Sequence, residues 1–152
     1  MSDPKIKIFL ADDDDDDREF FSTALESLNY PYELTMANNG ERVIDYFKAG
    51  ENIPDLVFLD INMPKADGIE CLVKIRELYP VKGPVVIMLS TSSSEKTIAL
   101  SRQYGASIYI EKPNQFNQLI RFLDYCLHDL KNAAPGEEFL LNTRLKGLVN
   151  KV

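Results

Sequence analysis

The stretch Ile6-Lys7-Ile8-Phe9-Leu10-Ala11 is followed at once by six aspartates, Asp12 to Asp17. A short apolar run that ends in carboxylates is typical of a buried strand that reaches the edge of a sheet. Two like charges about 4 Å apart repel by roughly 4 kcal/mol at an effective dielectric constant of about 20. A folded chain lowers this cost by exposing carboxylates to water or by placing them around a cation. We expect both, with Asp12 and Asp13 meeting a metal ion and Asp14 to Asp17 forming a solvated helix start.

The composition indicates one soluble globular domain. The 152 residues are 45% hydrophobic and 27% charged, and a chain of this length buries roughly 68–70% of its surface on folding. Because no apolar run approaches the ~20 residues of a membrane helix and no signal peptide is evident, we expect a cytoplasmic protein without membrane partners. The net charge of −7 argues against nucleic-acid binding. Cys71 and Cys126, far apart and outside any CxxC motif, are predicted to pack in helices.

Apolar runs alternate with helical patterns along the chain. The predicted strands are Ile6–Ala11, Glu33–Ala37, Leu56–Leu59, Val85–Leu89 and Ser107–Ile110. Three of them are nearly continuous aliphatic runs, which indicates burial on both faces and therefore a parallel sheet. Since each crossover between parallel strands is right-handed and needs a helix, the pattern predicts a doubly wound α/β domain with five parallel strands.

Helix starts and a domain end can also be predicted. Three pairs have the spacing of a capping box, namely Asp16 with Glu19, Asp67 with Glu70, and Ser92 with Glu95. The fifth helix is predicted from about residue 114 to residue 131. The segment Ala133-Ala134-Pro135-Gly136 ends that pattern, so we expect a domain over 1–131. The tail, 132–152, is expected to be partly helical and equally able to pack on the domain or to meet a partner.

Polar side chains follow four of the predicted strands. They are Asp12 and Asp13 after the first, Asp60 after the third, Ser90 after the fourth and Lys112 after the fifth. Because parallel strands end at one edge of the sheet and ligands bind there, we expect these side chains to lie close together. Carboxylate oxygens of this kind suit Mg²⁺, which is held by one or two carboxylates together with phosphate oxygens.

Four segments resemble the receiver domains of two-component response regulators. They are Leu10-Ala11-Asp12-Asp13, Phe58-Leu59-Asp60-Ile61-Asn62-Met63-Pro64, Met88-Leu89-Ser90-Thr91 and Tyr109-Ile110-Glu111-Lys112-Pro113. The resemblance covers about residues 5–131, with all motifs in the family's order and spacing. It implies a flavodoxin-like sheet in the order 2-1-3-4-5, followed here by a short C-terminal extension.

The resemblance implies a metal site and a phosphoryl acceptor. Asp60 corresponds to the aspartate that accepts a phosphoryl group from the phosphohistidine of a histidine kinase. Asp13 corresponds to a direct Mg²⁺ ligand, and Asp12 to the acidic neighbour that reaches the ion through water. The backbone carbonyl of Asn62 corresponds to a third ligand from the protein, next to Asp60.

The resemblance also implies how the phosphoryl group is stabilised and sensed. Lys112 corresponds to the lysine that pairs with a phosphoryl oxygen, and Ser90 to the hydroxyl that hydrogen-bonds another. Ser90 and Tyr109 together correspond to the switch residues, the aromatic ring turning inward upon activation. A metaphosphate-like transition state spreads charge over three oxygens, so positioning and neutralisation of this kind account for most of the catalysis.

The function implied is that of a stand-alone phosphoprotein switch in a phosphorelay rather than an enzyme. The activity expected is self-phosphorylation from phosphodonors and slow self-dephosphorylation, slow because Thr91 is bulky and Ser92 is not an acid or amide. The expected donor is a histidine kinase or a histidine phosphotransfer protein. Output is expected through the face of the fourth helix, fifth strand and fifth helix, toward a downstream protein or a second copy in a homodimer.

Two other functions fit the same residues less well, and a third stays open. A hydrolase of the haloacid dehalogenase type needs a second aspartate two residues after its nucleophile, where this chain has Asn62. A flavodoxin-like cofactor binder should present N–H groups and hydroxyls in its first loop, where this chain has carboxylates. A receiver-like interaction module that does not depend on phosphorylation stays open as the alternative.

Overall fold

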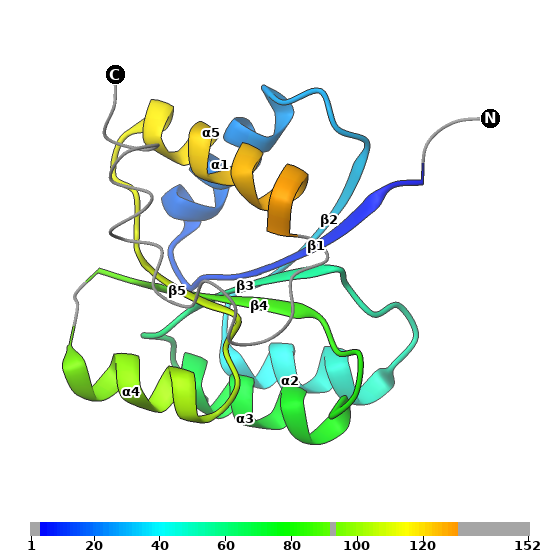
Figure 1. The fold of residues 1–152 in the computed structure, drawn as a ribbon, viewed down its shortest axis with the longest axis vertical. Coiled ribbons are helices and arrows are strands. Elements are labelled where there is room, and N and C mark those ends of the chain that lie inside the picture. Colours follow the sequence, from blue (N-terminus) through cyan, green and yellow to red (C-terminus); the bar gives the residue numbers. More distant parts are fainter. Residues whose placement is uncertain (1–3, 92–93, 131–152) are drawn as a thin grey trace.

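The computed structural model describes residues 4–91 and 94–130, in which five strands alternate with five α-helices (Figure 1). The elements are β1 (Ile6–Ala11), α1 (Asp15–Glu26), β2 (Tyr32–Ala37), α2 (Gly40–Ala49), β3 (Leu56–Asp60), α3 (Gly68–Leu78), β4 (Val85–Ser90), α4 (Glu95–Gln103), β5 (Ile108–Glu111) and α5 (Phe116–Tyr125). A π-helical turn, Cys126–Leu130, continues α5. The predicted tail, 132–152, and the predicted helix start at Ser92 lie outside the described residues.

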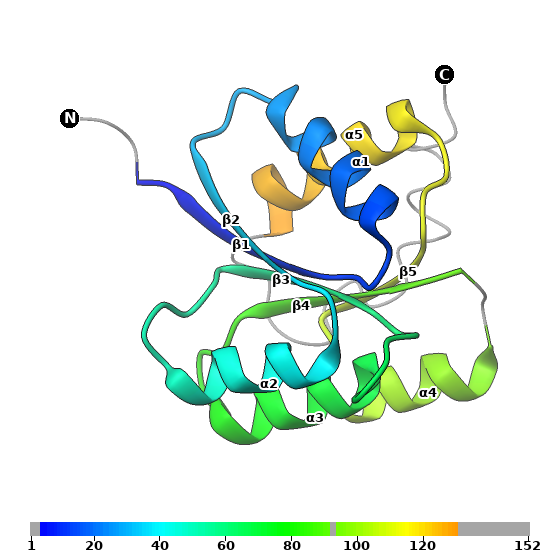
Figure 2. The same ribbon diagram turned by 180° about the vertical axis from the view of Figure 1, so that it is seen from behind.

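The five strands form one parallel sheet in the order β2-β1-β3-β4-β5. Helices α1 and α5 cover one face, and α2, α3 and α4 cover the other, as both views show (Figures 1 and 2). The central strands pair in register, so that Leu59 of β3 lies beside Met88 of β4 and Met88 lies beside Tyr109 of β5. The doubly wound, flavodoxin-like fold expected from the sequence is therefore confirmed.

Each face of the sheet has its own apolar core. Under α1 and α5, Leu10 and Phe58 pack with Phe122, while under α2 and α3, Phe9 and Leu59 pack on the opposite side. Alternate residues of one strand serve different cores, which explains the continuous aliphatic runs of the central strands. Cys71 and Cys126 are buried free thiols of these cores, as predicted.

Three strands continue one residue beyond the predicted end. Asp60, Ser90 and Glu111 are the last residues of β3, β4 and β5, and their backbones still pair with the neighbouring strand. The change to a polar side chain ended the apolar pattern, but backbone pairing does not depend on side-chain polarity. As a consequence, the sheet itself fixes the backbone of Asp60 and Ser90.

Of the two predicted helix starts that lie in the described residues, one agrees with the structure and one differs. Asp67 caps α3 as predicted, its side chain accepting a hydrogen bond from the N–H of Glu70 at 2.9 Å. In α1 the cap is Asp14, in extended conformation, rather than Asp16. Consecutive aspartates offer the same capping oxygen, so the point where the chain leaves β1 selects the residue. In α4 the cap is Ser94.

None of the helices in 4–91 and 94–130 combines the length and the hydropathy that a membrane span requires. The helix that contributes least to the core is α4, where Ser101 is the one side chain that is fully buried.

Candidate functional site

The ends of β1, β3 and β5 bring two acids and a lysine together. Lys112, directly after β5, places its Nζ 2.8 Å from Oδ2 of Asp12, which directly follows β1. The same Nζ lies 3.3 Å from Oδ2 of Asp60 at the end of β3. The backbone N–H of Lys112 donates to the carbonyl of Ser90 at 2.7 Å, which ties the end of β5 to the end of β4. The convergence expected from the strand ends is present.

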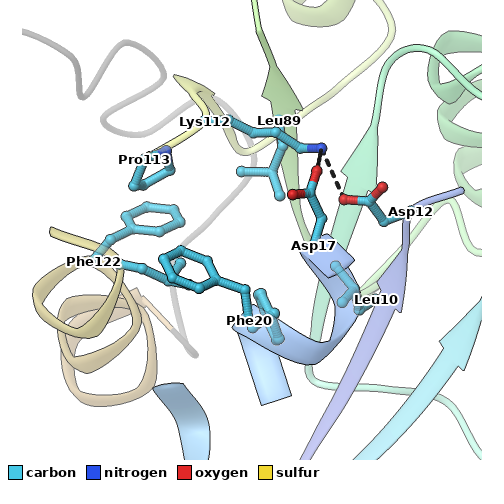
Figure 3. A pocket seen from close by; sticks show the side chains of 10 residues that line it. Leu10, Asp12, Asp17, Phe20, Leu89, Lys112, Pro113 and Phe122 are labelled. Atoms are coloured by element: carbon cyan, nitrogen blue, oxygen red, sulfur yellow. Dashed lines mark hydrogen bonds and ion pairs between the residues drawn. The ribbon is translucent and has the colours of Figure 1, made fainter. Parts of the chain in front are cut away.

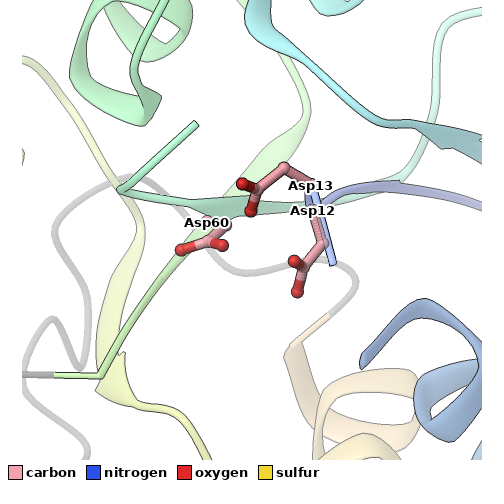
Figure 4. A group of neighbouring side chains, drawn as sticks. All are labelled: Asp12, Asp13 and Asp60. Atoms are coloured by element: carbon pink, nitrogen blue, oxygen red, sulfur yellow. The ribbon is translucent and has the colours of Figure 1, made fainter. Parts of the chain in front are cut away.

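Three carboxylates form a compact cluster at this edge (Figure 4). One oxygen from each of Asp12, Asp13 and Asp60 lies within 4.8 Å of the others. Asp12 is 2% exposed and Asp60 is 5% exposed, whereas Asp13 faces solvent. Buried carboxylates are costly unless a cation compensates them. Because all three donors are hard oxygens and one side is open to water, the cluster fits a divalent cation.

Asp60 is held in an unfavourable environment for its charge. Burial raises the pKa of Asp60 to about 6, the ammonium of Lys112 lowers it and the negative charge of Asp12 raises it. One backbone donor, the N–H of Asn62, lies 3.3 Å from Oδ1. Additional positive charge near Asp60 would therefore favour the ionised carboxylate, which is the nucleophilic form.

Lys112 contacts a third carboxylate that the sequence analysis did not assign to the site. Its Nζ lies 3.0 Å from Oδ2 of Asp17 in the first turn of α1 (Figure 3). Burial by itself lowers the pKa of Lys112, but the hydrogen bonds to Asp12 and Asp17 and the negative charges of Asp60 and Asp12 together raise the pKa above its ordinary value. The sequence alone predicts Asp17 as part of a solvated helix start. The contact could not be predicted because the sequence does not show where α1 begins. With the cap at Asp14, the side chain of Asp17 lies on the side of α1 that faces Lys112.

The loop from β1 to α1 is fixed by hydrogen bonds of its own. The N–H of Asp14 donates to Oδ1 of Asp12 at 3.0 Å, and Nη1 of Arg18 donates to the Asp12 carbonyl at 2.7 Å. Arg18 also forms an ion pair with Asp15. The backbone N–H of Asp12 continues the pairing with β2 by donating to the carbonyl of Ala37 at 3.1 Å. Asp12 therefore has little freedom to turn away from the site.

The loop after Asp60 is equally constrained. The N–H of Ile61 donates to the carbonyl of Leu89 at 3.0 Å, and the N–H of Gly68 donates to the carbonyl of Ile61 at 2.9 Å. A Cβ at Gly68 would lie 2.5 Å from the carbonyl oxygen of Asp60, closer than any side chain permits. Glycine at this position thus allows α3 to begin directly against the end of β3.

The expected switch residues lie on the two neighbouring strands, Ser90 as the last residue of β4 and Tyr109 within β5. Ser90 is 2% exposed at the end of β4, and Tyr109 of β5 is 0% exposed. The ring of Tyr109 belongs to the core beneath α2 and α3, with Ile98 of α4 packed against that core. Asn62 is exposed in the loop after Asp60. An open groove of about 490 Å³, lined in part by Lys112, Asp17 and Thr91, gives solvent access beside the cluster.

Comparison with known proteins identifies the family. Residues 8–124 match the sequence model of the response regulator receiver domain. The chain belongs to this family. The resemblance read from the four motifs is thereby confirmed, and receiver domains are in general signalling modules, not enzymes, that take phosphoryl groups from histidine kinases.

Relatives of this receiver domain occur in longer proteins. The chain is 30% identical over 148 residues to the 3',5'-cyclic-nucleotide phosphodiesterase regA of Dictyostelium discoideum, and 33% identical over 124 residues to the sensory transduction protein BceR of Halalkalibacterium halodurans. These matches cover 94% and 81% of this chain, but 18% of regA and 52% of BceR. The chain thus spans about half or less of these two relatives.

Solved receiver structures share the fold along their whole length. The phosphorylated cyanobacterial phytochrome response regulator RcpA has 29% identity and a TM-score of 0.75, with 88% of this chain and 99% of RcpA covered. The chemotaxis response regulator CheY4 of Vibrio cholerae has 25% identity and a TM-score of 0.65, with 80% and 98% covered.

Proposed function

We propose that this receiver domain is a phosphoryl-accepting switch in which Asp60 takes the phosphoryl group of a phosphohistidine. The donor is a histidine kinase or a histidine phosphotransfer protein. The observation that carries the proposal is the position of the Lys112 ammonium, 3.3 Å from the Asp60 carboxylate at the edge of the acidic cluster. A nucleophile beside a fixed cation and further oxygen ligands is the arrangement that phosphoryl transfer requires.

In the proposed reaction an oxygen of Asp60 attacks phosphorus as the P–N bond to the donor histidine breaks. The product is an acyl phosphate on Asp60, and the bonding electrons leave with the imidazole, which takes up a proton. Lys112 supplies a positive charge for one phosphoryl oxygen, and the hydroxyl of Ser90 donates to another. Both residues are anchored, because the N–H of Lys112 is bound to the carbonyl of Ser90.

The acidic cluster would hold Mg²⁺ in this proposal. Asp12, Asp13 and Asp60 offer carboxylate oxygens, and the backbone carbonyl of Asn62 is the proposed fourth donor. When bound, Mg²⁺ supplies the positive charge that a dianionic phosphoryl group needs near three carboxylates.

The proposed output is a change in the surface formed by α4, β5 and α5. Ser90 would move toward the phosphorylated Asp60, with the ring of Tyr109 staying buried, and α4 would follow. Because Ser101 is the one fully buried side chain of α4, a displacement of this helix exposes little apolar surface. A downstream protein, or a second copy of the chain, would then bind one state more tightly than the other, as any switch requires. The similar response regulator RcpA has been solved in a phosphorylated form.

The proposal is tested by incubating the protein with acetyl phosphate and Mg²⁺ and measuring the intact mass. We expect wild type to gain one phosphoryl group and Asp60→Asn to gain none. Asp45→Asn, an exposed aspartate of α2, is the matched control and should gain the group like wild type. Loss of the group after removal of the donor should take minutes or longer, since Thr91 narrows the approach of water.

No mass gain in wild type would contradict the proposal and favour the phosphorylation-independent interaction module. For the output surface, a candidate partner is titrated against the unmodified and the phosphorylated protein. Equal dissociation constants for the two states would refute the proposed change in the output surface.

A further inference from the structure

The ammonium group of Lys112 is fully committed to carboxylates. It has three N–H bonds, and it lies 2.8 Å from Asp12, 3.0 Å from Asp17 and 3.3 Å from Asp60. A phosphoryl oxygen on Asp60 that is to be bound by this ammonium must therefore replace one of these contacts. The free-energy cost of binding the phosphoryl group depends on which of these contacts is lost.

The three carboxylates differ in how far they are exposed to solvent. The side chain of Asp12 is 3% exposed, and its other oxygen is bound by the N–H of Asp14. The side chain of Asp60 is 8% exposed and is itself the proposed attachment point. The side chain of Asp17 is 48% exposed, so water can solvate its carboxylate once the lysine leaves. Of the two carboxylates that stay ionised when Asp60 is phosphorylated, Asp17 is the one whose contact to Lys112 costs less to lose.

We propose that Asp17 is a positioning residue that holds Lys112 away from the phosphoryl group and so slows its acceptance. In the unphosphorylated protein the ammonium lies between β1 and α1 (Figure 3), closer to Asp17 than to Asp60. Phosphorylation draws the ammonium from Asp17 to a phosphoryl oxygen. This inference rests on the proposed function, because it needs Asp60 as the acceptor.

The start of α1 holds Asp17 in a position where its carboxylate can compete with a phosphoryl oxygen for the ammonium of Lys112. The backbone N–H of Asp17 donates to Oδ1 of the cap residue Asp14 at 3.0 Å. Replacing the side chain of Asp17 by alanine leaves this backbone bond in place, so α1 should keep its start. The neighbouring Asp16 carries the same charge in the same turn, and among the described residues the ion pairs of Lys112 do not include it.

The test compares Asp17→Ala with Asp16→Ala in rates of phosphorylation by acetyl phosphate at constant Mg²⁺. Both variants remove one negative charge near the site, so their difference reports the direct contact to Lys112. We expect Asp17→Ala to raise the rate constant by about 3- to 10-fold, the effect of one hydrogen bond of ordinary net strength, because Asp17 is half exposed. Asp16→Ala should raise it by less than about 2-fold, as expected for a screened charge.

A second measurement follows the ammonium directly, by the nitrogen resonance of Lys112 in the unphosphorylated protein. The signal is assigned by its loss in Lys112→Arg. Asp17→Ala should shift this resonance and speed the exchange of its hydrogens, while Asp16→Ala should leave both unchanged. Beryllofluoride, as a phosphoryl mimic, should shift the wild-type resonance as well.

The outcomes separate this inference from the proposed function. If wild type accepts no phosphoryl group, the proposed function fails and the inference fails with it. If wild type is phosphorylated while Asp17→Ala and Asp16→Ala react alike, the role of Asp17 is refuted and the proposed function stands. An ammonium resonance that Asp17→Ala does not move would also refute it.

Discussion

Among single residues, Asp60 carries a negative charge that its buried environment destabilises and that a bound cation would stabilise. Asp60 is 5% exposed, and its pKa is raised to about 6 by burial and by the charge of Asp12, in spite of Lys112. The ionised form is therefore less stable in the folded protein than in the unfolded chain. A bound cation would relieve this cost, and so would neutralisation of the side chain.

The first prediction is that Asp60→Asn stabilises the metal-free protein near neutral pH. Below a pH of about 4, Asp60 is protonated in both the folded and the unfolded chain, so the variant gains nothing. As the pH rises through about 6, wild type loses the stability that the protonated carboxyl contributed, and the asparagine variant does not. We expect a gain in the free energy of unfolding of about 1–3 kcal/mol above pH 7, measured by urea denaturation in EDTA from pH 4 to 8.

Asp45→Asn is the control for this series. Asp45 is exposed in α2, so its replacement should change the free energy of unfolding by less than about 0.5 kcal/mol at each pH. An Asp60→Asn variant whose stability follows wild type across the whole range would contradict the unfavourable charge assigned to Asp60.

The individual site residues differ in how well the sequence predicts them. Asp12, Asp60 and Lys112 were predictable because each sits where an apolar run stops, and parallel strands stop at one edge. Asp17 was not, because its contact to Lys112 depends on the rotation of α1 about its axis. Within a run of identical side chains, no pattern reveals whether the helix is capped at Asp14 or at Asp16.

At the scale of elements, the sheet was predictable and the junctions were less so. Strands are visible as aliphatic runs, and helices are required between parallel strands. Ends such as Asp60 and Ser90 were placed one residue outside their strands, since side-chain polarity changes before backbone pairing does. The junction between β3 and α3 matters most, because it carries Asp60 and begins α3 within van der Waals contact of the strand.

The second prediction concerns Gly68 in this junction. A Cβ at position 68 would meet the carbonyl oxygen of Asp60 at 2.5 Å, so Gly68→Ala must displace the end of β3 or the start of α3. We expect a loss of about 1–3 kcal/mol in the free energy of unfolding, together with slower phosphorylation of Asp60. Urea denaturation and intact mass after acetyl phosphate treatment measure the two effects.

Gly83→Ala is the matched control, since a Cβ there would meet the carbonyl oxygen of Tyr79 at 2.7 Å. This loop, between α3 and β4, lies at the opposite ends of the strands. We expect a similar loss of stability with phosphorylation retained. If both variants slow phosphorylation to the same extent, general destabilisation explains the result, and the local displacement at Asp60 is refuted.

For the whole molecule, a ligand at one edge of the sheet acts on the stability of the entire fold. The cluster draws on β1 and β3, which pair with each other at the centre of the sheet. A cation that binds the folded but not the unfolded chain therefore adds to the free energy of unfolding.

The third prediction is that Mg²⁺ raises the thermal midpoint of wild type and that EDTA reverses the rise. At a free concentration about 100 times the dissociation constant the gain is about 2.7 kcal/mol, or several degrees for a chain of this size at roughly 2–4 °C per kcal/mol. Asp13→Asn should abolish the rise, because it removes the exposed ligand without touching the core. Asp45→Asn should keep it, and a rise that survives Asp13→Asn would place the ion elsewhere.

The small buried surface of α4 has a consequence for how the partner specificity of such domains evolves. Ser101, its one fully buried side chain, satisfies its own hydroxyl by donating to the carbonyl of Thr97 at 2.8 Å. Most side chains of this helix therefore contribute little to the apolar core. Substitutions on this helix can change which partner binds without altering the phosphoryl-accepting site at the end of β3. Separate signalling specificities can therefore evolve at little cost to the stability of the fold.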